Sequence, residues 1–166
     1  MFSKNFEDDD AMAIKEGPQY LLFYLQSHLF AFKASHISEI VELPQITKVP
    51  WMKPSIRGIC NIRGSIIGVL DIAKYLMDTD CMITEKSSLV IVNIEFEDSI
   101  HKIALMVDEV YEVEVFESEM LGNVPSFGLP IDSQYVASMV LYQNDFIPVL
   151  ALETIIDIEL LSRREE

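Results

Sequence analysis

Residues 59–76, ICNIRGSIIGVLDIAKYL, decide the fold class of this 166-residue chain. Two apolar runs rich in β-branched side chains flank Arg63 and Gly64, which is typical of paired strands. Gly64 is free to take the positive φ that a tight hairpin turn requires. Asp71 is placed to cap a short helix behind the second run. The stretch therefore predicts a hairpin that leads into a short helix, with Arg63 at the hairpin tip.

Composition limits the classes of protein to which the chain can belong. Half of its residues are hydrophobic, which favours a folded core over disorder. The net charge of −15 repels nucleic-acid phosphates and anionic lipid. There is no apolar run of about 18 residues and no signal-peptide pattern at the start, so we expect a cytoplasmic protein. Cys60 lies in an apolar run and Cys81 has no CxxC partner, which favours buried thiols over a disulfide.

Turn signals divide the chain into a tail, two similar halves and a short end. Residues 1–18 are acidic and aperiodic, so we expect a disordered tail. A folded region follows over 19–158, with a first barrel at about 20–77 and a second at about 88–158. Residues 159–166 form a charged end. Many short β segments favour two small five-stranded barrels packed together, with few short helices.

The two halves resemble each other, which suggests an old duplication. Each half contains a hairpin, an acidic group leading into an alternating strand, and a hairpin that ends in a short helix. The matching segments are 21–32 with 89–107, 38–43 with 108–113, and 69–73 with 149–153.

Motifs for catalysis are missing from the sequence. It has no GxGxxG, no P-loop and no HExxH pattern, and its three histidines have no metal-ligand spacing. A nucleophile pair of Cys60 and His36 stays open, because folding could bring the two together. A buried cysteine and a surface histidine are the commoner case. We therefore expect no enzyme activity and no cofactor.

The ordered set of segments resembles the CheW-like domain, the adaptor module of bacterial chemotaxis signalling, over about residues 20–158. The resemblance implies two SH3-like barrels around a shared apolar interface. The segments that carry it are LFYL at 22–25, FAF at 30–32, ISEI at 37–40, VP at 49–50 with Pro54, IRG at 56–58, NIRG at 61–64, LMVDEV at 105–110 and IPVL at 147–150.

The resemblance also implies roles for particular residues. Glu39 and Arg63 match an acid and a base that lie close together on the first barrel, where a guanidinium can bind a carboxylate in two-point fashion. The alternative is that both are exposed and unpaired. The positions that match the cleft for a receptor's helical tip are Ile37, Gly58, Leu89 and Val90. Leu89 and Val90 could equally be core, although a strand of period 2 buries only one of them against its own barrel.

A loop in the second half matches the surface that the family presents to the kinase's regulatory domain. Pro125 stiffens it and Phe127 is its aromatic anchor, the alternative being that the ring folds back onto its own barrel. Gly122 stands near the place of a family arginine, Gly68 where proline is common, and Ala151 where aspartate often follows the second hairpin.

The implied function is a non-enzymatic scaffold that couples chemoreceptors, the methyl-accepting chemotaxis proteins, to the histidine kinase CheA. It would bind a receptor signalling tip and the kinase regulatory domain, without nucleic acid or membrane insertion. One alternative is an adaptor of a pilus or other non-flagellar chemosensory system. Another is an unrelated small enzyme or peptide-binding double barrel.

Overall fold

The computed structural model describes residues 16–156, and its mainly-β fold confirms the predicted class. The predicted tail up to residue 15 and the charged end at 159–166 lie outside the described residues. The first half contains β1 (Gln19–Leu25), β2 (His28–Lys33), η1 (Ala34–His36), β3 (Ile37–Glu42), β4 (Ile56–Ile62), β5 (Ser65–Asp71) and α2 (Ile72–Met77). The second half contains β6 (Ser88–Phe96), β7 (Ser99–Val107), β8 (Glu109–Val115), η2 (Ser118–Met120), β9 (Leu121–Gly122), η3 (Ser133–Tyr135), β10 (Val136–Tyr142), β11 (Asp145–Leu150) and α3 (Leu152–Ile155).

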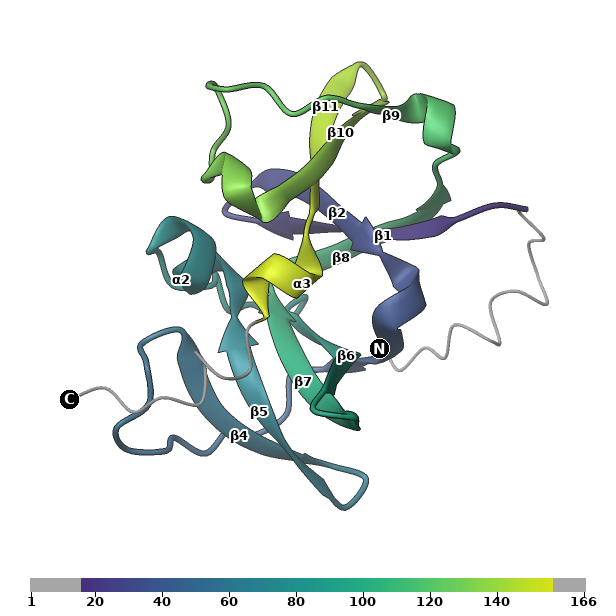
Figure 1. Ribbon diagram of the computed structural model, residues 1–166. Coiled ribbons are helices and arrows are strands. Elements are labelled where there is room, and N and C mark those ends of the chain that lie inside the picture. Colours follow the sequence, from purple (N-terminus) through teal and green to yellow (C-terminus); the bar gives the residue numbers. More distant parts are fainter. Residues whose placement is uncertain (1–15, 157–166) are drawn as a thin grey trace.

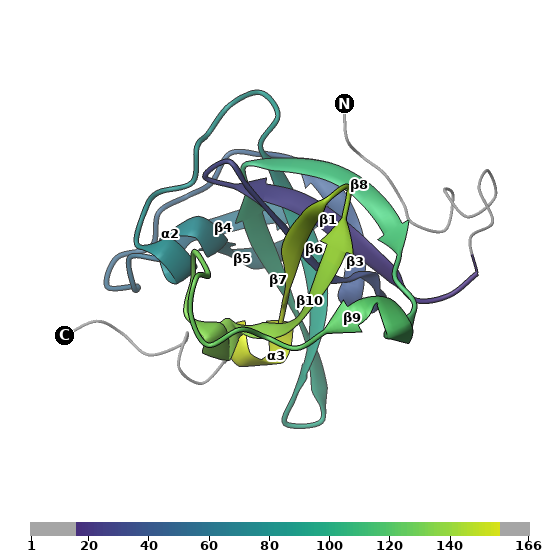
Figure 2. The ribbon, with the colours of Figure 1, turned by 90° about the horizontal axis from the view of Figure 1, so that it is seen from above.

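The strands form two sheets, each curled into a small SH3-like barrel. The first sheet has five strands, as predicted, in the order β3-β6-β7-β5-β4. The second has six instead of the predicted five, in the order β8-β1-β2-β11-β10-β9, because the two-residue β9 pairs with the edge of β10. Figure 1 shows the second sheet in the upper lobe and the first in the lower lobe, with α3 between them. In Figure 2 the β6–β7 hairpin extends well beyond the rest of its lobe.

The two halves of the chain exchange their first hairpins. The β1–β2 hairpin pairs with β8 and β11 of the second half, and the β6–β7 hairpin pairs with β3 and β5 of the first half. In both sheets the exchanged hairpin makes one antiparallel and one parallel contact. The same order of elements therefore builds both barrels, as expected for a duplicated sequence.

This exchange corrects the predicted barrel boundaries. We expected the first barrel at about 20–77 and the second at about 88–158. Instead, residues 19–33 belong to the second barrel, and residues 88–107 belong to the first. The prediction was wrong because it assumed that strands adjacent in the sequence pair within their own half, whereas sheet pairing is not local.

Strands β1 and β6 are buried on both faces, because the fold has an apolar core inside each barrel and a third core between the barrels. In β1, Tyr20 and Leu22 point into the second barrel, while Leu21 and Phe23 point between the barrels. Burial on both faces explains why these strands read as continuous apolar runs instead of alternating.

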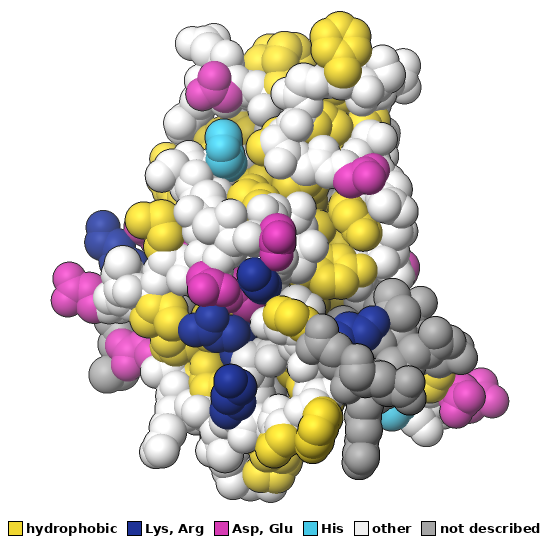
Figure 3. Space-filling model, turned by 90° about the vertical axis from the view of Figure 1, so that its left-hand side faces the viewer, with side chains coloured by type: hydrophobic (Ala, Val, Ile, Leu, Met, Phe, Trp, Pro, Cys, Tyr) yellow, Lys and Arg dark blue, Asp and Glu magenta, His cyan; other side chains and the backbone are white. Residues whose placement is uncertain are grey.

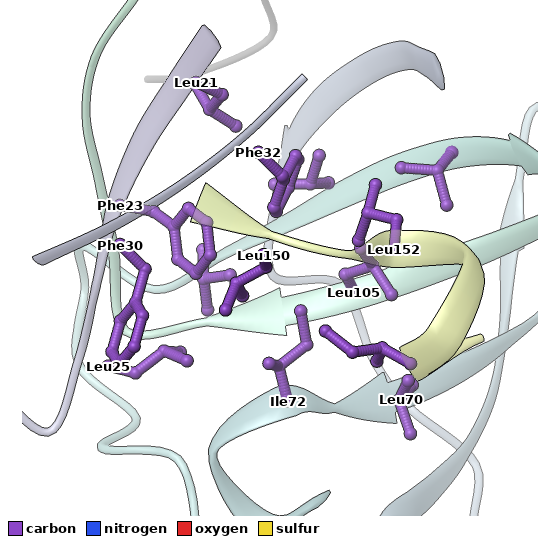
Figure 4. Close-up of a cluster of buried hydrophobic side chains, with 14 of the residues drawn as sticks. Leu21, Phe23, Leu25, Phe30, Phe32, Leu70, Ile72, Leu105, Leu150 and Leu152 are labelled. Carbon is purple, nitrogen blue, oxygen red and sulfur yellow. The ribbon is translucent and has the colours of Figure 1, made fainter. Parts of the chain in front are cut away.

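The core between the barrels receives side chains from both sheets and both short helices. Figure 4 shows this cluster, with Phe23 and Phe32 from the upper lobe, Leu70 and Leu105 from the lower lobe, and Ile72 and Leu152 from the two short helices. Phe23 and Phe32 lie with ring centroids 4.8 Å apart. Because neither barrel can lose this core without exposing large apolar side chains, the two barrels form one packed body.

Candidate functional site

The structure brings Glu39 and Arg63 together across the open edge of the first barrel. Arg63 Nη2 lies 2.9 Å from Glu39 Oε2. Glu39 belongs to β3 and Arg63 follows β4, and these two strands are the opposite edges of the five-stranded sheet. The ion pair therefore links the two edges where the sheet curls around. Arg63 is 73% exposed and Glu39 16% exposed, so the pair is partly solvated.

The tip that carries Arg63 is a two-residue turn between Ile62 and Ser65. Arg63 has φ 53° and Gly64 has φ 88°, the two positive values that this class of hairpin turn requires. The Gly64 N–H donates a 2.9 Å hydrogen bond to Asn61 Oδ1. The local sequence thus fixes the hairpin tip, which holds the guanidinium near β3.

Leu89 and Val90 do not line an open groove, which corrects the prediction made for them. Both side chains are fully buried. Leu89 lies inside the first barrel and Val90 in the core between the barrels. The alternation argument was right that the two point in opposite directions. It failed because β6 is sandwiched between two cores, so neither direction leads to solvent.

Gly58 permits a close approach, but to its own chain. A Cβ at this position would collide with the carbonyl oxygen of Thr47, and φ is 144°. Thr47 and Ile59 exchange two backbone hydrogen bonds of 2.8 Å, which pin the segment after β3 onto β4. Gly58 is buried. It therefore shapes the first barrel and offers no surface to a receptor.

Ile37 is the one predicted groove residue whose side chain stays partly exposed. It begins β3, pairs with Val92, and packs at the edge of the core between the barrels. A register shift between Ile37 and Glu39 bends the strand at this point. The two residues thus lie next to each other on β3, the apolar one near the core and the acidic one held by Arg63.

Phe127 projects from the loop between β9 and η3. Its side chain is 85% exposed and Pro125 is also exposed. Gly128, with φ 90°, follows it and allows the chain to turn back. The alternative in which this ring folds onto its own barrel does not occur. The loop borders a hollow of about 980 Å³ on the second barrel, whose lining includes Pro125 and Gly128.

Two further apolar residues that line this hollow were not predicted from the sequence. Leu141 and Phe146 are cross-strand neighbours in the β10–β11 hairpin, both are more than half exposed, and both line the same hollow. The signal was available in the sequence. A two-residue turn at 143–144 places Leu141 opposite Phe146, on the face turned away from buried Val140.

Buried carboxylates that hold the connector between α2 and β6 were also missed. Asp71 Oδ2 accepts a 3.0 Å hydrogen bond from the Cys81 N–H, and Asp108 Oδ1 accepts one of 3.0 Å from the Cys81 thiol. Asp108 Oδ2 accepts a 2.7 Å bond from the Gln26 N–H. Asp108 stands where the chain passes from β7 to β8, so it ties the second barrel to the connector of the first.

Burial governs the ionisation of this group of side chains. Desolvation, with the hydrogen bond to Asp108 adding to it, raises the pKa of the Cys81 thiol far above its ordinary value. Desolvation also raises the pKa of Asp71, against the opposing hydrogen bonds from the Cys81 and Lys74 N–H groups. Cys81 therefore stays a thiol and acts as a donor, not as a nucleophile.

The structure does not pair the two residues considered as a nucleophile and its base. Cys60 is buried inside the first barrel. His36 Nε2 instead lies 3.3 Å from Glu153 Oε1, so His36 of η1 contacts Glu153 of α3. No helix in the stretch 16–156 is long and apolar enough to cross a membrane.

Comparisons with known proteins agree on one family. The family model described as CheW-like domain matches residues 19–160. A chemotaxis protein CheW of Bacillus subtilis is 24% identical over 147 residues, covering 88% of this chain and 91% of the relative. A chemotaxis protein CheW of Klebsiella aerogenes is 21% identical and covers 74% of this chain and 72% of the relative. The crystal structure of the scaffolding protein TtCheW from Thermoanaerobacter tengcongensis superimposes with a TM-score of 0.76 at 25% identity, covering 89% of this chain and 92% of the other.

Proposed function

The chain belongs to the CheW-like domain family, and from that premise we propose that it is a chemotaxis scaffold that couples chemoreceptors to the histidine kinase CheA. Such a scaffold acts by holding its two partners in fixed positions, which requires no catalysis and no cofactor. The names of the two curated relatives favour a chemotaxis system over a pilus-type system. Action in the cytoplasm follows from this proposal.

The observation that carries the proposal is the presence of two separate outward faces on one packed body. The first face contains Ile37, Glu39 and Arg63 on the first barrel. The second contains the exposed loop of Phe127 beside the apolar hollow of the second barrel. The core between the barrels joins the two faces rigidly. Coupling between two partners requires such a connection.

We assign the receptor tip to the first face. Ile37 supplies a partly exposed apolar contact, and the Glu39–Arg63 pair fixes the neighbouring β3 and hairpin tip. An amphipathic helical tip suits an apolar edge with a fixed charged neighbour. Leu89 and Val90 are fully buried, so in this assignment they support the first face from inside the fold.

We assign the kinase regulatory domain to the second face. Phe127 is an aromatic side chain held out by a loop that Pro125 stiffens, so little conformational entropy is lost on docking. Leu141 and Phe146 add exposed apolar side chains to the lining of the hollow that this loop borders. Aromatic anchors of this kind dominate the binding energy of many interfaces.

Reciprocal variants test both assignments. Phe127→Ala is expected to weaken binding of the isolated kinase regulatory domain by about 1–3 kcal/mol in titration calorimetry, the common range for an interface aromatic. The melting temperature should hardly change, because the ring is mostly exposed. Ile37→Asp should weaken binding of a receptor tip and spare the kinase contact, because it would bury an unpaired charge.

Ile100→Ala serves as the control for Phe127→Ala, since Ile100 is also a mostly exposed apolar residue, 70% exposed, on the β6–β7 hairpin of the other barrel. It should leave both affinities unchanged. The assignment of the second face is wrong if Phe127→Ala lowers the melting temperature steeply while the affinity of the folded protein stays the same. The two faces are reversed if Phe127→Ala affects only the receptor and Ile37→Asp only the kinase.

A further inference from the structure

A third surface, separate from both proposed faces, combines positive charge with apolar side chains. It is a groove of about 910 Å³ between the segment 44–54 that follows β3, the start of β4, α2 and the connector. We call it the Trp51 groove. Its charged lining residues are Lys48, Lys53, Arg57, Lys74 and Asp80, and its exposed apolar ones include Trp51 and Ile83.

The Trp51 groove concentrates positive charge on an acidic protein. The chain carries a net charge of −15, yet four of the eight lysines and arginines between residues 16 and 156 line this one groove. Asp80 is the one acidic residue among its described lining residues. Figure 3 shows Lys and Arg side chains gathered beside hydrophobic ones in the lower half of this side of the molecule. Such a local reversal of sign sets the groove apart from the rest of the surface.

Two of the four cations are available for a ligand. Arg57 Nη1 lies 3.5 Å from Asp71 Oδ2 and 3.8 Å from Asp80 Oδ1, and the Lys74 ammonium lies 3.0 Å from an Asp78 oxygen. Lys48 and Lys53 form no ion pair with any residue in the described range 16–156. These two lysines are therefore the charges that an acidic ligand would neutralise.

Trp51 is held outward by its backbone. It is 71% exposed and has φ 68°, a conformation that costs free energy for a bulky side chain. Pro50 and Pro54 restrict the backbone on either side of it. An exposed tryptophan on a stiffened loop loses little entropy when it is covered, which favours a contact role over a packing role.

We propose that the Trp51 groove binds an acidic, extended peptide segment of a partner protein. An apolar side chain of the segment covers Trp51 and Ile83, and its carboxylates approach Lys48 and Lys53. Charge complementarity selects this occupant, because the remaining surface of the chain repels acidic segments. The inference does not depend on the receptor or kinase assignments, because none of their residues lines the groove.

The chain contains a single tryptophan, so its fluorescence reports directly on this groove. The probe is a short synthetic peptide of alternating aspartate and leucine, without tryptophan. It should produce a saturable shift of the Trp51 emission. The double variant Lys48→Glu/Lys53→Glu should bind it at least about tenfold more weakly, the effect of losing two close charge pairs.

The matched control is Lys33→Glu/Lys102→Glu, which changes the net charge equally at two exposed lysines outside the groove. This variant should keep the affinity of the unchanged chain. The proposal is overturned if both double variants weaken binding equally, since only the overall charge would then matter. It is also overturned if the peptide gives no saturable shift. If the Trp51 emission shifts with protein concentration and no peptide, and sedimentation shows dimers, the occupant is a second copy and the peptide proposal is wrong.

Discussion

Replacing Asp108 by alanine should destabilise the fold by removing the acceptor that ties the two barrels to the connector. Its carboxylate accepts bonds from the Gln26 N–H at 2.7 Å, the Cys81 thiol at 3.0 Å and the Met82 N–H at 3.1 Å. Hydrogen bonds to a charged group contribute about 1.5–3 kcal/mol each. Water can reach the partly buried donors and replace part of these bonds. We therefore expect the free energy of unfolding to fall by about 3 kcal/mol, less than the sum of the three bonds.

Urea unfolding of Asp108→Ala measures this loss directly. At about 2–4 °C per kcal/mol for a chain of this size, the melting temperature should fall by about 10 °C. Hydrogen exchange should accelerate most at the Gln26 and Met82 amides, because each loses its acceptor. That pattern separates a local loss of the connector from general loosening of the core.

Asp145→Ala is the matched control, because Asp145 carries the same charge at an exposed position at the start of β11. Its unfolding free energy should stay within about 0.5 kcal/mol of the unchanged chain. The reasoning is refuted if Asp108→Ala costs no more than this control. It is also refuted if the Gln26 and Met82 amides stay as protected as before.

Two further variants probe the ends of the hairpins. Arg63→Ala should lower the free energy of unfolding by about 1 kcal/mol, because Arg63 is mostly exposed and surface ion pairs are weak. A double-mutant cycle with Glu39→Gln should show coupling, and purely additive effects would contradict the pairing. Ala151→Asp should stabilise the chain by about 1 kcal/mol in urea unfolding, because α3 lacks a side-chain cap and an aspartate there can accept from a backbone N–H of the first turn, as Asp71 does in α2. Ala151→Leu should give no such gain, and an equal gain would rule out capping.

Features fixed by neighbouring residues could be predicted from the sequence. The β4–β5 hairpin, its turn at Arg63 and Gly64, and the cap of α2 by Asp71 all depend on residues within a few positions of one another. The partners of each strand could not be predicted in this way. The exchanged hairpins meet strands from the other half of the chain, and no local pattern specifies that choice.

The candidate site residues also divide into those that could be predicted from the sequence and those whose surroundings depend on distant parts of the chain. The resemblance to a known family brought out Glu39 and Arg63, although they are separated in sequence, and the loop signals brought out exposed Phe127. Leu89 and Val90 were misjudged because burial on two faces depends on the second barrel being present. Asp108 was missed because an acidic residue between two strands looks the same in the sequence whether it faces solvent or a connector.

The exchange of hairpins determines when each barrel can form while the chain is being synthesised. When the ribosome has released residues up to the connector, β3, β4 and β5 still lack the β6–β7 hairpin that lies between them in the sheet. The β1–β2 hairpin at that stage has no β8 or β11 with which to pair. The first half alone therefore cannot complete a barrel. The first barrel can close once β7 has emerged up to Val107, whereas the second must wait for β11, which ends at Leu150. Folding should therefore proceed in two steps, in which the first barrel closes before the second. The face of β6 that belongs to the core between the barrels stays uncovered until the β1–β2 hairpin pairs with β8 and β11.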